Sequence, residues 1–122
     1  MPKRVLDHTS VRIADLPRSR EFYEKILGFR PAPRPELGIP GVWYDLGVGQ
    51  LHLIQRDGPA AGRGGGIDPT DPHFAVQVED LDAMRRQLKE AGIEMLDLGA
   101  DQLWVHDPDG NTVELRGPAA RS

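Results

Sequence analysis

Apolar and polar residues alternate over residues 5–13, as they do in a strand with one face against a core. His8 lies on the polar face of this predicted strand. The next segment is apolar at positions that share one face of a helix, and it is bounded by the capping residue Asp15 and the terminating Gly28. The pattern therefore predicts a strand followed by a helix that covers the apolar side of a sheet.

The same order of elements returns in the second half of the chain. A strand pattern covers 73–78, Asp80 is placed to cap a helix, and Gly92 is placed to end it. Three short strand patterns follow each helix, and their expected bounds are 29–34, 42–46 and 50–56, then 93–98, 102–106 and 111–116. The chain is thus predicted to hold two βαβββ modules, which makes an α+β fold.

Self-similarity supports this duplication. A shift of 65 residues lays HTSVRIADLP (8–17) over HFAVQVEDLD (73–82), with four identities in ten positions. Average residue usage would give roughly one identity in fifteen. Module 1 is expected at about 5–56 and module 2 at about 72–117, and the stretch between them, about 57–71, is rich in Gly and Pro and is interpreted as a linker.

The composition narrows the classes of protein. A chain of 122 residues fits one domain, 1–122. No apolar run approaches the ~18 residues that cross a bilayer, and the first residues lack the apolar core of a secretory signal, so a cytoplasmic protein without membrane contact is expected. A formal charge of −4 without a basic stripe argues against nucleic acid as a partner. Because cysteine is absent, His and carboxylates are the metal ligands available.

Four polar residues fall at equivalent places in the two modules: His8 and His73 on the first strand, His52 and Glu114 on the last. Leu51 and Leu53 flank His52, and Val113 and Leu115 flank Glu114, so alternation directs the polar side chain away from the core. If the modules pack with approximate twofold symmetry, two donors from each meet near the axis. Imidazole and carboxylate suit one divalent ion, Zn, Ni, Co, Mn or Fe, with a position left open to substrate. For any single member, the alternative is a hydrogen-bonded structural residue.

Other residues of the polar face are candidates for contact with a small-molecule substrate. Arg12 and Gln77 occupy equivalent places and could bind a substrate oxygen. Trp43, Tyr44 and Trp104 could line a pocket, although aromatic residues on strands also serve as core or dimer interface. His106 has no counterpart in module 1 and precedes the turn sequence DPDG, so it is interpreted as structural or peripheral.

These motifs resemble a known family. The segments DHTSVRIADLPRSREFYEKILGF (7–29), QLHLI (50–54), DPHFAVQVEDLD (71–82) and DPDGNTVEL (107–115) are similar to the vicinal oxygen chelate superfamily, the glyoxalase, bleomycin-resistance and dioxygenase fold. The likeness extends from about Val5 to Gly117.

The resemblance implies paired modules that form a cup around a divalent metal, with ligands at His8, His52, His73 and Glu114, and it implies a homodimer. One departure concerns the second ligand, because glyoxalase I has Glu where this chain has His52.

The leading hypothesis is a metal-dependent enzyme of glyoxalase I type, a lyase or isomerase. It would isomerise a small α-oxo compound or its thiol hemithioacetal through a metal-chelated enediolate. Glu114 is the first candidate for the general base and His52 the second. The alternatives are a fosfomycin-type thiol transferase or an iron-dependent dioxygenase that uses His8, His73 and Glu114, and a drug-sequestering resistance protein without turnover.

Overall fold

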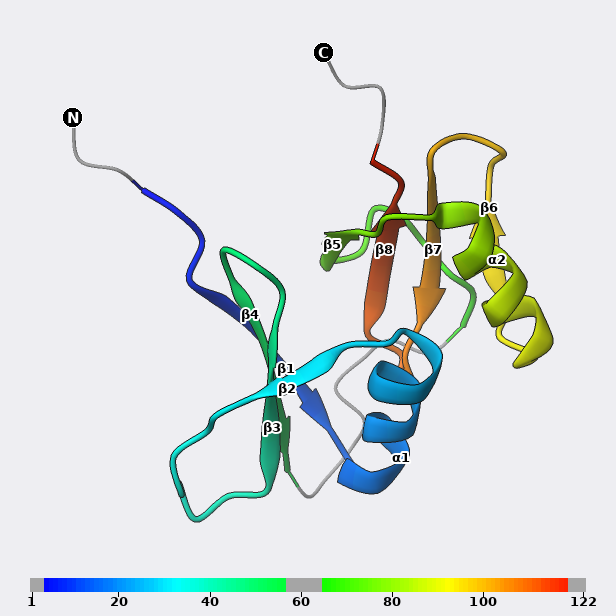
Figure 1. Cartoon of the computed structure of the whole chain (residues 1–122). Helices are drawn as coiled ribbons and strands as arrows, with labels where there is room; N and C mark the ends of the chain where they lie inside the picture. Colours follow the sequence, from blue (N-terminus) through cyan, green and yellow to red (C-terminus); the bar gives the residue numbers. More distant parts are fainter. Residues whose placement is uncertain (1–3, 57–64, 119–122) are drawn as a thin grey trace. The chain divides into compact units, whose positions relative to one another are not determined.

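The computed structural model describes residues 4–56 and 65–118 of the chain. They belong to two compact units, 1–61 and 62–122, which we call module 1 and module 2. The predicted linker at about 57–71 therefore lies partly outside the described residues. Figure 1 gives the elements of both modules.

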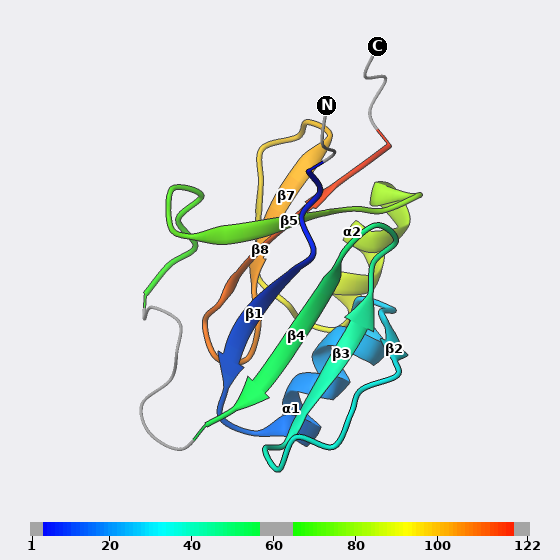
Figure 2. The ribbon, with the colours of Figure 1, turned by 90° about the vertical axis from the view of Figure 1, so that its left-hand side faces the viewer.

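Module 1 is a four-stranded mixed sheet with one helical segment against it (Figure 2). The spatial order of the strands is β1-β4-β3-β2, with β1 parallel to β4 and the other pairs antiparallel. The elements in chain order are β1 (His8–Ile13), α1 (Leu16–Arg20), η1 (Glu21–Ile26), β2 (Arg30–Ala32), β3 (Gly41–Asp45) and β4 (Gln50–Gln55).

The helical segment of module 1 starts as predicted and then changes its pitch. The side chain of Asp15 accepts a hydrogen bond from the backbone N–H of Arg18 at 3.0 Å, which caps α1. From Glu21 on, the backbone is a π-helix, and the N–H of Leu27 donates to the carbonyl of Phe22 at 3.0 Å. Gly28 then ends the segment at a φ of 77°, a conformation that glycine adopts without steric cost.

The core of module 1 is aromatic. Tyr23 and Tyr44 are fully buried, and the rings of Phe22, Tyr23, Phe29 and Tyr44 lie 5.0–5.9 Å from one another along the cluster. The Tyr44 hydroxyl donates to Oε2 of Glu24 at 2.9 Å. Burial, together with this hydrogen bond, raises the pKa of Tyr44 above its usual range, so the phenol stays protonated.

Module 2 repeats the topology with its own four strands. Their order is β5-β8-β7-β6, with β5 parallel to β8 and the remaining pairs antiparallel (Figure 1). The elements in chain order are β5 (His73–Gln77), α2 (Leu81–Glu90), β6 (Met95–Asp97), β7 (Gln102–His106) and β8 (Thr112–Arg116).

A regular helix covers the core of module 2. The side chain of Asp80 accepts a hydrogen bond from the N–H of Ala83 at 2.9 Å, and Gly92, at a φ of 73°, lies past the end of the helix. The buried side chains of this core are aliphatic or Met apart from Trp104: Leu81, Met84, Leu88, Leu103, Val105, Val113 and Leu115.

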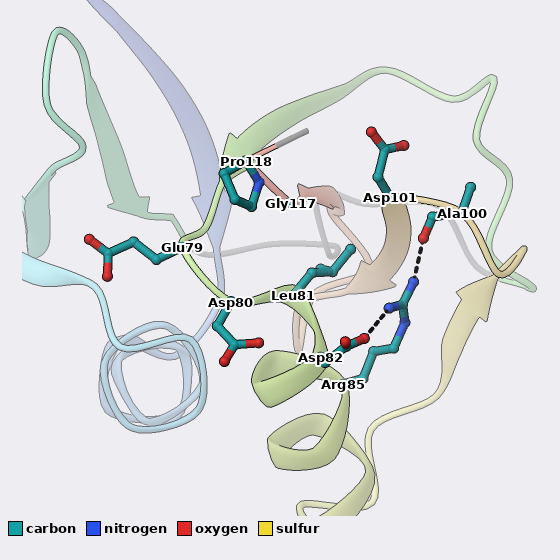
Figure 3. A pocket seen from close by; sticks show the side chains of 9 residues that line it. All are labelled: Glu79, Asp80, Leu81, Asp82, Arg85, Ala100, Asp101, Gly117 and Pro118. Carbon is teal, nitrogen blue, oxygen red and sulfur yellow. Dashed lines mark hydrogen bonds and ion pairs between the residues drawn. The ribbon is translucent and has the colours of Figure 1, made fainter. Parts of the chain in front are cut away.

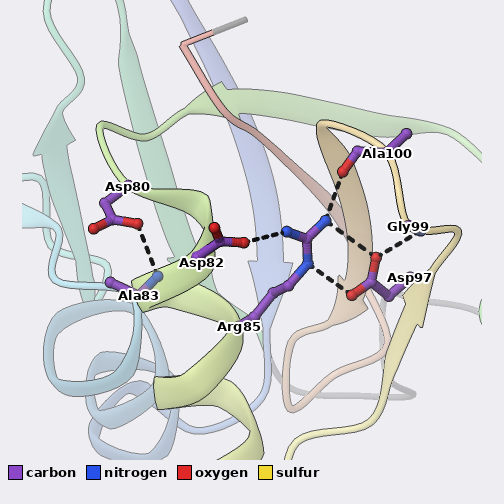
Figure 4. A network of polar contacts seen from close by, with 7 residues as sticks. All are labelled: Asp80, Asp82, Ala83, Arg85, Asp97, Gly99 and Ala100. Atoms are coloured by element: carbon purple, nitrogen blue, oxygen red, sulfur yellow. Dashed lines mark hydrogen bonds and ion pairs between the residues drawn. The ribbon is translucent and has the colours of Figure 1, made fainter.

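Arg85 fastens α2 to the edge of the sheet in module 2 (Figure 4). Its Nε donates to Oδ2 of Asp97 at 2.7 Å, Nη1 donates to Asp82 at 2.7 Å, and Nη2 donates to the carbonyl of Ala100 at 2.6 Å. The hydrogen bond from Arg85, with a smaller contribution from the N–H of Gly99, holds the pKa of Asp97 below its usual 3.8.

The predicted α+β fold of two βαβββ modules is confirmed. Most of the expected strand bounds differ from the observed ones by one or two residues. The largest difference is at β1, which begins at His8 instead of residue 5, and Val5 is 60% exposed. No helix among the described residues is both long and apolar enough to span a membrane.

Candidate functional site

In module 1, His52 occupies the middle of a stack of three rings. It lies on β4, opposite Ser10 on β1 and Trp43 on β3. The His52 ring is 4.1 Å from the ring of His8 at an interplanar angle of 13°, and 4.2 Å from Trp43 at 5°. Because β4 is flanked by β1 and β3, the two partners come from opposite sides. The predicted ligands His8 and His52 are thus side by side, and Trp43 fixes the second of them.

The surroundings of His52 in module 1 favour the neutral form of its imidazole. Burial lowers the pKa of His52 below its usual 6.5, and the charge of His8 lowers it further. Nε2 of His52 lies 2.9 Å from Oε1 of Gln50, and Nδ1 of His8 lies 2.8 Å from Oδ2 of Asp7. A metal binds the neutral imidazole, so an environment that disfavours protonation also favours ligation.

Arg34 adds a fixed cation to this face of module 1. It comes from the β2–β3 loop, and its Nη2 donates to the carbonyl of Ile39 at 2.7 Å. Its guanidinium lies over Gly41, where a Cβ would come within 3.0 Å of Nη2 and 2.4 Å of the carbonyl oxygen of Leu53. Position 41 therefore excludes a side chain, and the charge of Arg34 is among the causes that lower the pKa of His52.

In module 2, the equivalent pair is in direct contact. Nε2 of His73 lies 3.0 Å from Oε1 of Glu114, and Nδ1 of His73 lies 2.8 Å from the carbonyl oxygen of Asp71. Glu114 is buried on β8, opposite Ala75 on β5 and Trp104 on β7. The structure therefore brings together the two predicted ligands of this module.

The His73–Glu114 contact suits a bound cation. A carbonyl oxygen only accepts, so Nδ1 carries the ring hydrogen, and in the neutral ring Nε2 presents a lone pair to a carboxylate that also only accepts. Two such atoms 3.0 Å apart need a proton or a metal ion between them. Two ligands of one zinc ion, each about 2.1 Å from it, lie about 3 to 3.4 Å apart. The donor pair of module 2 thus fits a divalent metal.

Metal donors come in pairs within the modules. Among residues 4–56 and 65–118, no group of three or more His, Asp or Glu side chains is placed to hold a metal ion. Each module offers two of the four predicted ligands on equivalent strands. The set of four ligands remains a prediction, because it requires two donors from module 1 and two from module 2.

Arg116 and Gln102 are site residues that the sequence analysis did not single out. Nη1 of Arg116 donates to Oε2 of Glu114 at 2.7 Å and to Oε1 of Gln102 at 2.6 Å. The sequence could have indicated Arg116, since it follows Glu114 by two residues and so lies on the same face of the strand. The contribution of Gln102 depends on the β7–β8 register, which pairs it with Arg116.

The predicted substrate-contact residues also occupy equivalent places. Trp43 and Trp104 pair with His52 and Glu114 on the neighbouring strand of each sheet. The indole nitrogen of Trp104 is buried without a hydrogen-bond partner among the described residues. Arg12 and Gln77 are exposed at the ends of β1 and β5. Their substrate role remains a prediction.

His106, interpreted from sequence as structural or peripheral, ends β7 opposite Thr112. Its Nε2 is buried and makes no hydrogen bond among the described residues. The turn that follows is built around Asp107, whose side chain accepts hydrogen bonds from the N–H groups of Asp109 and Asn111. Asp107 thus fixes the entry of the chain into β8, which carries Glu114.

A cavity of about 390 Å³ lies elsewhere on module 2 (Figure 3). It is bounded by the start of α2 and by the segment after β8, and its walls include Asp80, Leu81, Arg85 and Asp101. The Arg85 guanidinium in its wall is already engaged by Asp82, Asp97 and the Ala100 carbonyl. None of the predicted ligands or substrate-contact residues lines this cavity.

A duplicated βαβββ fold with paired imidazole and carboxylate donors on its strands defines a class of α+β proteins with metal-binding potential. The chain belongs to the glyoxalase/bleomycin resistance protein/dioxygenase superfamily, whose family model matches residues 5–115.

The chain is similar to enzymes of this superfamily. The chain is 35% identical over 120 residues to glyoxylase I 4 of Arabidopsis thaliana, with 90% of this chain and 68% of the relative covered. It is 32% identical over 102 residues to the mitochondrial methylmalonyl-CoA epimerase of Bos taurus, with 75% of this chain and 56% of the relative covered. The fold is similar to that of a glyoxalase family protein from Bacillus anthracis, with a TM-score of 0.76, 25% identity, and coverage of 96% and 97%.

Proposed function

We propose that the protein is a metal-dependent enzyme of glyoxalase I type that isomerises a small α-oxo compound or its thiol hemithioacetal. The observation that carries the proposal is the paired arrangement of donors, His8 with His52 and His73 with Glu114, at equivalent positions of two modules. The similarity to glyoxylase I 4 supports it.

Four side chains would hold the metal, one of Zn, Ni, Co, Mn or Fe: His8, His52, His73 and Glu114. When bound, the ion polarises the substrate carbonyl and offsets the negative charge that develops as the neighbouring carbon loses its proton. Hydrogen bonds to the outer atoms of these ligands orient them, as Asp71 does for His73.

Glu114 is the proposed general base. Once loosened from the metal, its Oε1 would take the proton from the carbon that bears the sulfur and hydroxyl groups and would return it to the adjacent carbon. The hydroxyl proton would pass to the neighbouring carbonyl oxygen, so that the substrate and the product are isomers. Trp43 and Trp104 would pack against the substrate, and Arg12 and Gln77 would donate hydrogen bonds to its oxygens. His52 is the second candidate for the base, and its neutral ring is held between His8 and Trp43.

The first test is substitution of the base. Glu114→Gln keeps the size of the side chain and removes its ability to accept a proton, so we expect turnover of methylglyoxal with a thiol to fall by about 10² to 10⁴. Metal analysis of the untagged protein and the circular dichroism spectrum would accompany the assay. A folded Glu114→Gln protein with wild-type turnover would exclude Glu114 as the base.

The alternative candidate function is epimerisation of a branched acyl thioester, which the similarity to methylmalonyl-CoA epimerase favours. It shares the removal of a proton from a carbon beside a carbonyl. The two reactions are distinguished by supplying each substrate in D₂O: an epimerase incorporates deuterium into methylmalonyl-CoA, whereas a glyoxalase leaves that thioester unlabelled.

We further propose that the protein works as a homodimer, as the resemblance to this superfamily implies. Light scattering on the purified protein should then give twice the mass of the 13.5 kDa chain. A mass of one chain over the concentration range of the activity assay would reject the dimer.

A further inference from the structure

The two oxygens of the Glu114 carboxylate have different partners. Oε1 lies 3.0 Å from Nε2 of His73, whereas Oε2 accepts a hydrogen bond from Nη1 of Arg116 at 2.7 Å. Only 9% of the Glu114 side chain is exposed, so water has little access to either carboxylate oxygen. Oε1 thus faces the predicted metal ligand His73, and Oε2 is bound to the guanidinium of Arg116.

Arg116 is itself held in place. The same Nη1 donates to Oε1 of Gln102 at 2.6 Å, across the register pair that joins β7 to β8. Because Arg116 and Glu114 are two residues apart on one strand, their side chains lie on the same face. Charge-assisted hydrogen bonds of this length are among the stronger ones in proteins. Gln102, Arg116 and Glu114 therefore form a chain of contacts that ends at Oε2 of Glu114 and leaves Oε1 of Glu114 to His73.

The sheet does not require this arginine. Register and repeat place Ile54 of module 1 at the position equivalent to Arg116, and Gly41 at that of Gln102. Module 1 builds the same strand pairing with these apolar residues, and there the ligand His52 is held by ring stacking instead. Module 1 does have a guanidinium over Gly41, that of Arg34, but it donates to the carbonyl of Ile39.

We propose that Arg116 is a positioning residue that anchors Glu114 through Oε2, with Gln102 behind it, so that Oε1 is the oxygen presented to the metal and, after it loosens from the metal, to the substrate proton. This inference rests on the proposed function, in which Glu114 is a ligand and the base. Without the anchor, the carboxylate rotates about its side-chain bonds and binds metal less tightly, because outer-shell partners that orient a ligand typically contribute 10- to 100-fold to metal affinity.

The test compares metal binding by Arg116→Met and Arg116→Lys with that of the wild type. Metal-free full-length protein is titrated with Co²⁺ by calorimetry, and the visible spectrum of the Co²⁺ form is recorded. We expect Arg116→Met to weaken Co²⁺ binding about 10- to 100-fold and to alter the spectrum. Arg116→Lys should recover part of the loss, since an ammonium can still donate to Oε2.

Arg85→Met is the matched control. It removes another ion-paired arginine of module 2 that contacts none of the predicted ligands, so it should lower thermal stability and leave Co²⁺ affinity and the spectrum unchanged. If Arg116→Met does not fold, Gln102→Leu takes its place, and it should weaken Co²⁺ binding by a smaller factor. Wild-type affinity and spectrum in Arg116→Met, or in Gln102→Leu where only that variant folds, would overturn the inference.

Glu114→Gln, titrated in parallel, separates this inference from the proposed function. If Glu114→Gln weakens Co²⁺ binding and Arg116→Met does not, the anchoring role of Arg116 is rejected while the metal site stands. If Glu114→Gln binds Co²⁺ as tightly as the wild type, Glu114 is not a ligand, and both proposals fail.

Discussion

The two modules share a topology and differ in what they place on it. Module 1 holds His52 between two rings and packs an aromatic core, whereas module 2 holds Glu114 through a salt bridge and packs a mainly aliphatic one. Residues 1–61 contain nine Lys or Arg and seven Asp or Glu, and residues 62–122 contain six and twelve. A duplicated backbone thus preserves the positions of the predicted ligands, while the contacts that hold these side chains differ between the modules.

The largest expected effect comes from exchanging the ligands one at a time. If module 1 only holds the metal and module 2 also moves the proton, His52→Gln should lower turnover by about 10- to 100-fold, through weaker metal binding. Glu114→Gln should lower it by about 10² to 10⁴. Initial rates with Co²⁺ held at a concentration that just saturates the wild type give the comparison. Equal losses in the two variants under these conditions would remove the distinction between the modules.

A second comparison uses equivalent core residues. Leu53 and Leu115 are both fully buried on the core-facing side of the last strand of their modules. Replacing either by Ala should lower the free energy of unfolding by about 2 to 5 kcal/mol. Urea denaturation followed by circular dichroism measures it.

The same experiment tests the predicted single domain. A unit of about 60 residues is only marginally stable by itself, so we expect each variant to shift one common transition. Two separate transitions, with each variant shifting a different one, would show that the modules unfold independently.

The smallest effect concerns the ion pair that fastens α2. Arg85→Met should cost about 1 kcal/mol or less, since both partners are partly exposed. The folded-state pKa of Asp97 is lowered, so this stabilisation is present above the usual value of 3.8 and is lost as the pH falls through the folded pKa. The difference between Arg85→Met and the wild type should therefore shrink in acid melts, and an unchanged difference at pH 2 would argue against it.

Local signals account for most of what the sequence predicted. Asp15 and Asp80 cap their helices, and Gly28 and Gly92 adopt positive φ, because capping and left-handed turns depend on a few adjacent residues. Strand alternation placed His52 and Glu114 on the face opposite the buried leucines. The internal repeat then paired each of them with the histidine on the parallel strand.

Features that depend on packing or register were missed. A count of apolar positions does not reveal the π-helical geometry of η1, in which Phe22 and Tyr23 are buried. The contact of Gln102 with Arg116 requires the alignment of β7 with β8, which joins residues 14 apart. The position of Arg34 over Gly41 depends on the conformation of the β2–β3 loop.

The parallel pairing of first and last strands has a consequence for how the protein is made. Residue 8 pairs with residue 50, and residue 73 with residue 112, so each sheet joins the two ends of its own module. During synthesis on the ribosome, β1 has no parallel partner until β4 has emerged. Folding is slow in such a topology, because the entropy cost of closing a long loop comes before the stabilising contacts between its ends are formed. The nascent chain therefore carries an unpaired strand edge for most of the translation of each half.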